Sequence, residues 1–291
     1  MCHTSMVSMA RYFHKERGKA LSIAALGYPL GDACLPIGIA AVLQSYGITI
    51  TWWMIFAFAV IVITPLLSYL LNDHAARHQS YLKHLEKEKE NAVGFTPRQV
   101  LQDWKFYFVT LGVLAPGFVN TGIFFQNAEL IHMKGWPQYV YAASLVNYAL
   151  GNISGSFISG ILIDKFKSTR VISFYLLPML MGIIILLQIA PIWAIYIFML
   201  GIGLSQGASS VIVGAVWAEL YGSKYLGTIR SWVSSLKVLF TAISPALFGL
   251  LIDHGISFSS ILFACAFYTL FSVGSLMTVT LKLKSLQSKE A

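Results

Sequence analysis

Charged residues are scarce in this sequence. Only 11% of its 291 residues are Asp, Glu, Lys or Arg, whereas 57% are hydrophobic and the mean hydropathy is +0.70. Soluble domains carry about 25% charged residues, and a soluble globule of this composition would expose large apolar patches. The scarcity of charge therefore excludes an ordinary soluble domain and indicates a polytopic membrane protein.

Cysteine and the common catalytic motifs are also scarce or absent. The three cysteines, Cys2, Cys34 and Cys265, have spacings that form neither a disulfide framework nor a metal site. The sequence contains no HExxH zinc motif, no GxSxG nucleophile motif and no phosphate-binding loop. We therefore predict that the protein is not an enzyme and that it binds no metal and no cofactor.

Long apolar runs, by contrast, fill most of the chain. A bilayer core about 30 Å thick requires roughly 20 apolar residues per helix, and a spanning segment must satisfy its backbone polar groups internally. The predicted fold class is therefore all-α, a polytopic bundle of membrane-spanning helices. Eight spans are predicted near 20–45, 49–72, 105–131, 138–163, 170–189, 191–220, 227–252 and 257–281.

The cations are confined to alternate loops. Eighteen of the 20 Lys and Arg residues lie in the segments 1–19, 73–105, 164–170, 221–230 and 282–291. The other loops hold only Lys134, and Lys237 lies inside an apolar run. Because loops rich in Lys and Arg face the cytoplasm, residues 1–19, the linker 73–104 and the C-terminal tail are predicted to be cytoplasmic. This distribution explains the net charge of +8 without a surface for nucleic acid.

Two segments resemble each other at an offset of 209 residues. RGKALSIAALGYPLGDACLPIGIAAVL (17–43) and LGTIRSWVSSLKVLFTAISPALFGLLI (226–252) share a glycine and a proline at equivalent positions. Parallel repeats related by an axis along the membrane normal build one large class of transporters. The aligned pairs are Gly18 with Gly227 and Pro36 with Pro245.

The repeat predicts the domain organisation. Six spans follow the linker and only two precede it, so the first half is expected to lack about three and a half spans. We expect residues 1–72 to be the remainder of an N-terminal six-helix half, 73–104 a cytoplasmic linker and 105–291 a C-terminal six-helix half. The chain would then hold about eight helices of an original twelve, and the missing helices or another chain would complete it.

The segment GILIDKFKSTR, residues 160–170, resembles the loop motif of the major facilitator superfamily, Gly-x-x-x-Asp-Arg/Lys-x-Gly-Arg/Lys. Gly160, Asp164 and Lys165 match this motif, Lys167 stands where the family has glycine, and Arg170 comes slightly late. The resemblance implies the fold of that superfamily and a cytoplasmic gate built from these residues.

In such a gate, an acid at a helix end accepts hydrogen bonds from the positive N-terminus of a neighbouring helix. Opening the gate would break this network, as a two-state rocking mechanism requires. The alternative is that the cations of the motif act only as anchors on the cytoplasmic side. Glu219, near Lys224 and Arg230, is a further candidate for a gate or anchor pair.

The stretches 11–31 and 218–253 are similar to bacterial branches near the monocarboxylate and oxalate/formate transporters. The resemblance implies a symporter or antiporter in the bacterial inner membrane. Its expected partners are the lipid bilayer and a small organic anion, moved together with or against protons.

Two ionisable residues, Asp32 and Lys237, lie deep inside predicted spans. Such residues are energetically costly in a bilayer and are functional candidates for that reason. In the repeat, the two positions differ by four residues, so they lie on equivalent faces one turn apart. Lys237 is expected to attract an anionic substrate, and Asp32 to carry a coupling proton. The alternative is a structural ion pair, with each other or with other helices.

Four amide side chains inside the spans are the remaining candidates for substrate binding. Asn120 and Asn127 are expected to share one face of the span 105–131, and amides in a cavity suit a small polar solute. The alternative is that they bond neighbouring helices to one another. The four residues are Asn120, Asn127, Asn147 and Gln206.

Two functions remain open from the sequence. The first is a secondary active transporter that works by alternating access. The second is a membrane protein that derives from a transporter but does not transport, such as a remnant or a scaffold.

Overall fold

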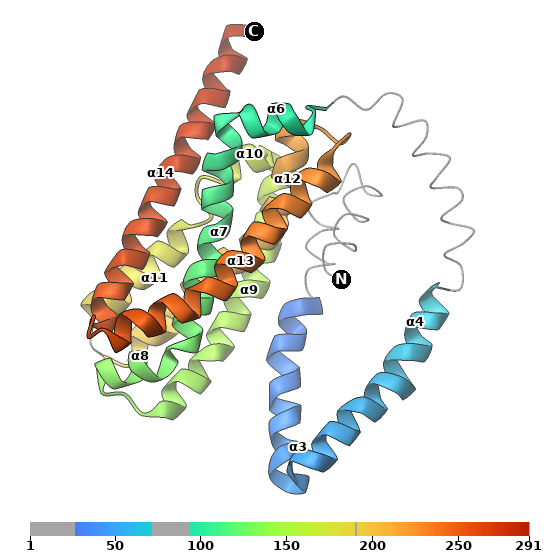
Figure 1. Ribbon diagram of the computed structural model, residues 1–291, viewed down its shortest axis with the longest axis vertical. Coiled ribbons are helices and arrows are strands. Elements are labelled where there is room, and N and C mark those ends of the chain that lie inside the picture. The colour runs from blue at the N-terminus through green and yellow to red at the C-terminus, as the bar shows by residue number, and fades with distance from the viewer. Residues whose placement is uncertain (1–26, 72–93, 190, 291) are drawn as a thin grey trace. The chain divides into compact units, whose positions relative to one another are not determined.

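The computed structural model describes residues 27–71, 94–189 and 191–290, and its long elements are all α-helices (Figure 1). Six helical stretches are long and apolar enough to cross a membrane in this part of the chain. These stretches are Ser45–Leu66, Trp104–Phe125, Tyr139–Phe166, Trp193–Tyr221, Leu226–Asp253 and Phe258–Ser285. The predicted all-α membrane fold is confirmed, and six of the eight predicted spans have counterparts among these stretches.

The chain divides into two compact units. One unit comprises Gly31–Gly94, and the other contains Phe95–Ala291 together with the segment that ends at Leu30. The predicted boundaries at residues 72 and 104 describe a different division, by family halves, and they stay a prediction.

The unit Gly31–Gly94 contains a helical hairpin with its turn at Gly47. Helix α3 is Gly27–Phe58, the π-helical turn η1 is Ala59–Ile63, and α4 is Thr64–Leu71. Gly47 has φ 76° and ψ 172°, a conformation that residues with a Cβ rarely adopt. The chain reverses direction there (Figure 1), which agrees with a loop between the predicted spans 20–45 and 49–72. Residues 20–26 of the first span lie outside the described residues.

In the other unit, the part of the chain from Phe95 onward begins with two helices whose N-termini are capped by side chains. α6 is Pro97–Gln102, and Thr96 and Gln99 form a reciprocal capping box at its N-terminus. α7 is Trp104–Phe125, and the Asp103 carboxylate accepts a hydrogen bond from the Lys105 backbone N–H at 3.0 Å. The short α8, Asn127–Lys134, is separated from α7 by Gln126.

Six further helices follow among the described residues of this unit. They are α9 (Gln138–Phe166), α10 (Ser168–Val171), α11 (Leu177–Gln188), α12 (Trp193–Tyr221), α13 (Leu226–Asp253) and α14 (Phe258–Glu290). In Figure 1 they form a bundle with α7, in which α7 packs against α12, α13 and α14. α12 also packs against α9 and α11.

The regular helix within the predicted span 170–189 is shorter than that span. Residues 172–176 form turns, and the regular helix α11 has only 12 residues. These turns are fixed by contacts with other helices: the Tyr175 hydroxyl donates to the Gly112 carbonyl at 2.7 Å, and Ser173 bonds Thr280 at 2.6 Å. The apolar composition of this segment was compatible with a helix, so only these contacts reveal the turns.

Helices α9 and α12 approach so closely that their backbones touch. A Cβ atom on Gly155 or Gly207 would collide with the carbonyl oxygen of Leu204 or Asn152, respectively. Ser156 adds a hydrogen bond from its hydroxyl to the Gly207 carbonyl at 3.2 Å. Without a hydrophobic driving force in lipid, helices associate through such small-residue contacts. One helix of this pair, α12, also carries Gln206 of the candidate site.

Candidate functional site

Lys237 lies on α13 against a glycine of α7. A Cβ atom on Gly117 would meet the Lys237 Cε atom at 3.4 Å and the Thr241 Cγ2 atom at 2.9 Å. The absence of a side chain at Gly117 therefore leaves the room that the lysine occupies. The Lys237 side chain is half-buried. Within the part of the chain that the structure describes, no carboxylate lies at ion-pair distance from its ammonium group.

Asn120 lies three residues after Gly117, about one turn further along the same face of α7. Its side chain is only 5% exposed, and its Nδ2 atom donates to the Gln206 Oε1 atom of α12 at 3.3 Å. The Asn120 Oδ1 atom is buried and has no hydrogen-bond partner among the described residues. Such a buried acceptor is costly unless something donates to it.

Three of the predicted site residues therefore gather where α7, α12 and α13 meet. We call Lys237, Asn120 and Gln206 the polar cluster. Gly117 and Asn120 share a face of α7, so the Lys237 side chain beside Gly117 and the amide pair at Asn120 lie within about one turn of each other along that helix. A cation, an amide and an unpaired carbonyl oxygen together offer both donors and an acceptor to a small anionic solute.

The other two asparagines are not part of the polar cluster. The Asn147 Nδ2 atom donates to the Tyr196 carbonyl of α12 at 3.4 Å, which is the interhelical bonding considered as the alternative role. The expectation that Asn127 shares a helix face with Asn120 is wrong, because α7 ends at Phe125. Asn127 begins α8, and its side chain donates to the Phe124 carbonyl at 2.8 Å.

Asp32 belongs to helix α3 in the other unit. Its side chain lies outside what the structure describes, so its pairing with Lys237 or with a proton stays a prediction.

The gate motif lies at the end of α9 and the beginning of α10. Gly160 is buried within α9, whereas Asp164 and Lys165 are exposed in its last turns and Arg170 is exposed on α10. Lys167, which stands where the family has glycine, has φ 68° and ψ 148°. This backbone conformation favours glycine and is strained for lysine. The backbone at residue 167 therefore has a conformation that suits the glycine of the motif which this segment resembles.

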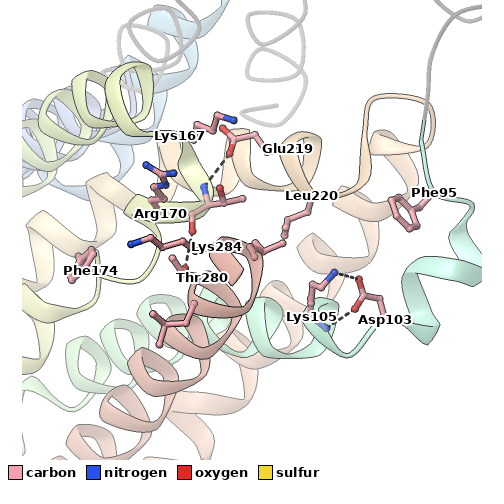
Figure 2. Close-up of a pocket in the computed structure, with 13 residues that line it drawn as sticks. Phe95, Asp103, Lys105, Lys167, Arg170, Phe174, Glu219, Leu220, Thr280 and Lys284 are labelled. Atoms are coloured by element: carbon pink, nitrogen blue, oxygen red, sulfur yellow. Dashed lines mark hydrogen bonds and ion pairs between the residues drawn. The ribbon is translucent and has the colours of Figure 1, made fainter. Parts of the chain in front are cut away.

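Glu219, at the end of α12, contacts the N-terminus of α10 beside the gate motif. Its carboxylate oxygens accept hydrogen bonds from the backbone N–H groups of Ser168 at 2.9 Å and Thr169 at 3.1 Å, and Figure 2 shows the Glu219 side chain at the corner of a pocket. A contact between an acid and a helix N-terminus is thus present at Glu219, which lies 55 residues after Asp164 in the sequence. Its place at the end of a span was the only sequence signal for this role. Arg230, a predicted partner of Glu219, donates instead to the Gly214 carbonyl at 2.8 Å.

Residues 3–149 match the Major Facilitator Superfamily. The chain belongs to the major facilitator superfamily. No curated protein matches the sequence. The matched residues include the hairpin around Gly47, the whole of α7 and part of α9.

Membership of the major facilitator superfamily identifies the protein as a multi-pass membrane protein of a transporter family. The large apolar side chains on the outside of the bundle suit that setting, because lipid tails replace water around them. Exposed examples on α9 and α14 are Leu150, Ile158, Ile161, Phe263, Phe267 and Phe271.

Proposed function

We propose that this protein is a secondary active transporter of a small organic anion, such as a monocarboxylate, and that it works by alternating access. The observation that supports the proposal is the polar cluster, in which a half-buried ammonium group has no carboxylate partner among the described residues. A charge inside a membrane span is costly when unpaired. A carboxylate substrate would supply the missing counter-charge and accept hydrogen bonds from the amides.

The chemistry of the polar cluster favours a small and singly charged solute. Lys237 contributes one positive charge, and Asn120 and Gln206 contribute neutral donors and acceptors. Asn120 and Gln206 already bond each other at 3.3 Å, so a substrate would engage their remaining groups. Asn127 and Asn147 bond backbone carbonyls, and we assign them no contact with substrate.

We assign the coupling proton to Asp32. Carboxyl groups inside spans serve as proton relays in transporters, and the proposed role is that Asp32 binds a proton within the span and releases it to the aqueous phase. This arrangement suits either a symporter or an antiporter. The resemblance to bacterial carriers suggests an inner-membrane location. The alternation of cations along the sequence supports a cytoplasmic position for residues 1–19, the linker 73–104 and the C-terminal tail.

Uptake by the full chain, reconstituted in liposomes, tests the role of Lys237. We expect an inward proton gradient to drive accumulation of radiolabelled formate or lactate. Lys237→Gln should reduce the initial rate at least tenfold, because the counter-charge is lost, whereas Lys237→Arg should retain part of it. The matched control is Lys224→Gln, which removes an exposed cation that lies over the Tyr225 ring at 5.8 Å.

Two outcomes would contradict the proposal. Unchanged uptake in Lys237→Gln would remove the lysine from the transport mechanism. No uptake of any small organic anion by a folded, correctly inserted chain would favour the other candidate, a transporter-derived membrane protein that does not transport.

A further inference from the structure

A second polar site lies at the end of the bundle near the gate motif. It is a cavity of about 540 Å³ between the beginning of α7, the α9–α10 junction, and the ends of α12 and α14 (Figure 2). Gly117, beside Lys237, is 12 residues along α7 from Lys105, which places the two sites about 18 Å apart along that helix. The cavity is therefore distinct from the polar cluster.

Cations dominate the lining of this cavity. Lys105, Lys167, Arg170 and Lys284 face it, together with the two acids Asp103 and Glu219. We call the site the cationic pocket. Its cations come from α7, α10 and its preceding junction, and α14, so tertiary packing rather than a local run of basic residues produces the charge.

Both acids of the cationic pocket already have partners. Asp103 accepts from the Lys105 backbone N–H at 3.0 Å and lies 3.6 Å from the Lys105 Nζ atom. The carboxylate of Glu219 accepts from two backbone N–H groups. Among the residues that the structure describes, Lys167, Arg170 and Lys284 have no carboxylate at ion-pair distance. The pocket is thus lined by four cations and two acids, a net charge of +2, and three of its cations form no ion pair with either acid.

A hydrogen bond links the two segments that carry two of these cations. The Thr280 hydroxyl donates to the Thr169 carbonyl at 2.8 Å. Lys284 is one helical turn after Thr280, and Arg170 follows Thr169 directly. Figure 2 shows the Arg170 and Lys284 side chains on the same side of this link. The bond therefore joins the two segments that carry the guanidinium and the ammonium group, and both groups form charge-assisted hydrogen bonds with phosphate.

Large apolar side chains border the cations. Phe174 is 59% exposed and Leu281 is 56% exposed, and both line the pocket. Below them, the outer surfaces of α11 and α14 continue with the exposed residues Met181 and Met277. A ligand with a phosphate head and hydrocarbon tails would match both parts of this surface.

We propose that the cationic pocket binds the phosphate headgroup of an anionic phospholipid, with its acyl chains along the apolar surface beside Phe174 and Leu281. Basic pockets at the membrane surface between helices bind such headgroups. A soluble phosphate would use the cations but would leave the exposed apolar border in contact with water. The lipid is favoured over free phosphate for this reason. A bound lipid would bridge α10 and α14 beside the Glu219 contact and would stabilise that arrangement of the gate.

Thermal melting of the purified full chain in a neutral detergent tests the proposal. We expect dioleoyl phosphatidylglycerol to raise the melting temperature in a saturable manner, and dioleoyl phosphatidylcholine to raise it far less. The double variant Arg170→Gln/Lys284→Gln should need at least about tenfold more phosphatidylglycerol for half of the effect, since each cation near a membrane surface contributes about 1 kcal/mol. The charge-preserving variant Arg170→Lys/Lys284→Arg should stay within a few-fold of the parent chain.

Lys224→Gln is the matched control, because it removes a cation outside the pocket and should leave the titration unchanged. The proposal is overturned if the double variant titrates like the parent chain, or if phosphatidylcholine has an equal effect. It is also overturned in favour of free phosphate if millimolar inorganic phosphate stabilises the parent chain as strongly and displaces the lipid.

Discussion

The Glu219 carboxylate accepts a hydrogen bond from the Ser168 backbone N–H at 2.9 Å, across 51 residues of sequence. A second bond, from Thr169, completes the contact. It connects the end of α12 to the α9–α10 junction, where the gate motif lies. Because the acceptor is charged and the donors are backbone groups, a conformational change that separates these segments must break two charge-assisted bonds.

Removing the charge of Glu219 should loosen this junction. We expect Glu219→Gln to lower stability by about 1 kcal/mol, because an exposed charge-assisted bond becomes a neutral one. For a chain of this size the melting temperature should fall by about 2–4 °C. The control is Asp253→Asn, another exposed acid at a helix end. An equal loss in both variants would show that Glu219 has no special contact.

Replacing Lys167 by glycine should stabilise the same junction. The residue has φ 68°, and relief of this strain should contribute about 1 kcal/mol. Lys165→Gly is the matched control: it removes a neighbouring lysine within helix α9, where glycine should destabilise by about 1 kcal/mol. Melting curves of the two variants should therefore shift in opposite directions, and a shift in the same direction would contradict the assignment.

Gly207→Ala should disrupt the α9–α12 interface. The new Cβ would collide with the Asn152 carbonyl oxygen. Because this oxygen belongs to the backbone of α9, the two helices would have to move apart to make room. We expect a loss of about 3 kcal/mol or failure to accumulate folded protein. Gly227→Ala is the control, since nothing lies within 4 Å of its new Cβ. Size-exclusion profiles and melting curves measure the difference, and equal behaviour of the two variants would refute the close approach.

The Asn120–Gln206 hydrogen bond should give a measurable coupling energy between the two side chains. Each single change, Asn120→Ala or Gln206→Ala, leaves the other amide without its partner. A double-mutant cycle on stability should give a coupling of about 1 kcal/mol. Additive effects of the two changes would place the amides too far apart to interact. If the polar cluster binds substrate, both single variants should also raise the KM for uptake.

The sequence by itself determined the class of the protein and most of its helices. Charge is scarce and apolar runs are long, and a lipid environment allows such runs only as helices or closed barrels. The predicted spans 191–220, 227–252 and 257–281 begin within two residues of α12, α13 and α14. The motif at Gly160, Asp164 and Lys165 indicated the family before the comparison confirmed it.

The tertiary structure decided which polar residues meet. Asn120 and Gln206 are 86 residues apart, and their bond depends on the packing of α7 against α12. The same is true of Glu219 with Ser168, and of the cations that line the cationic pocket. The break at Gln126 and the turns around Tyr175 also escaped prediction. Hydropathy measures how well a segment suits lipid, but it carries no information about the neighbour against which a helix packs or bends.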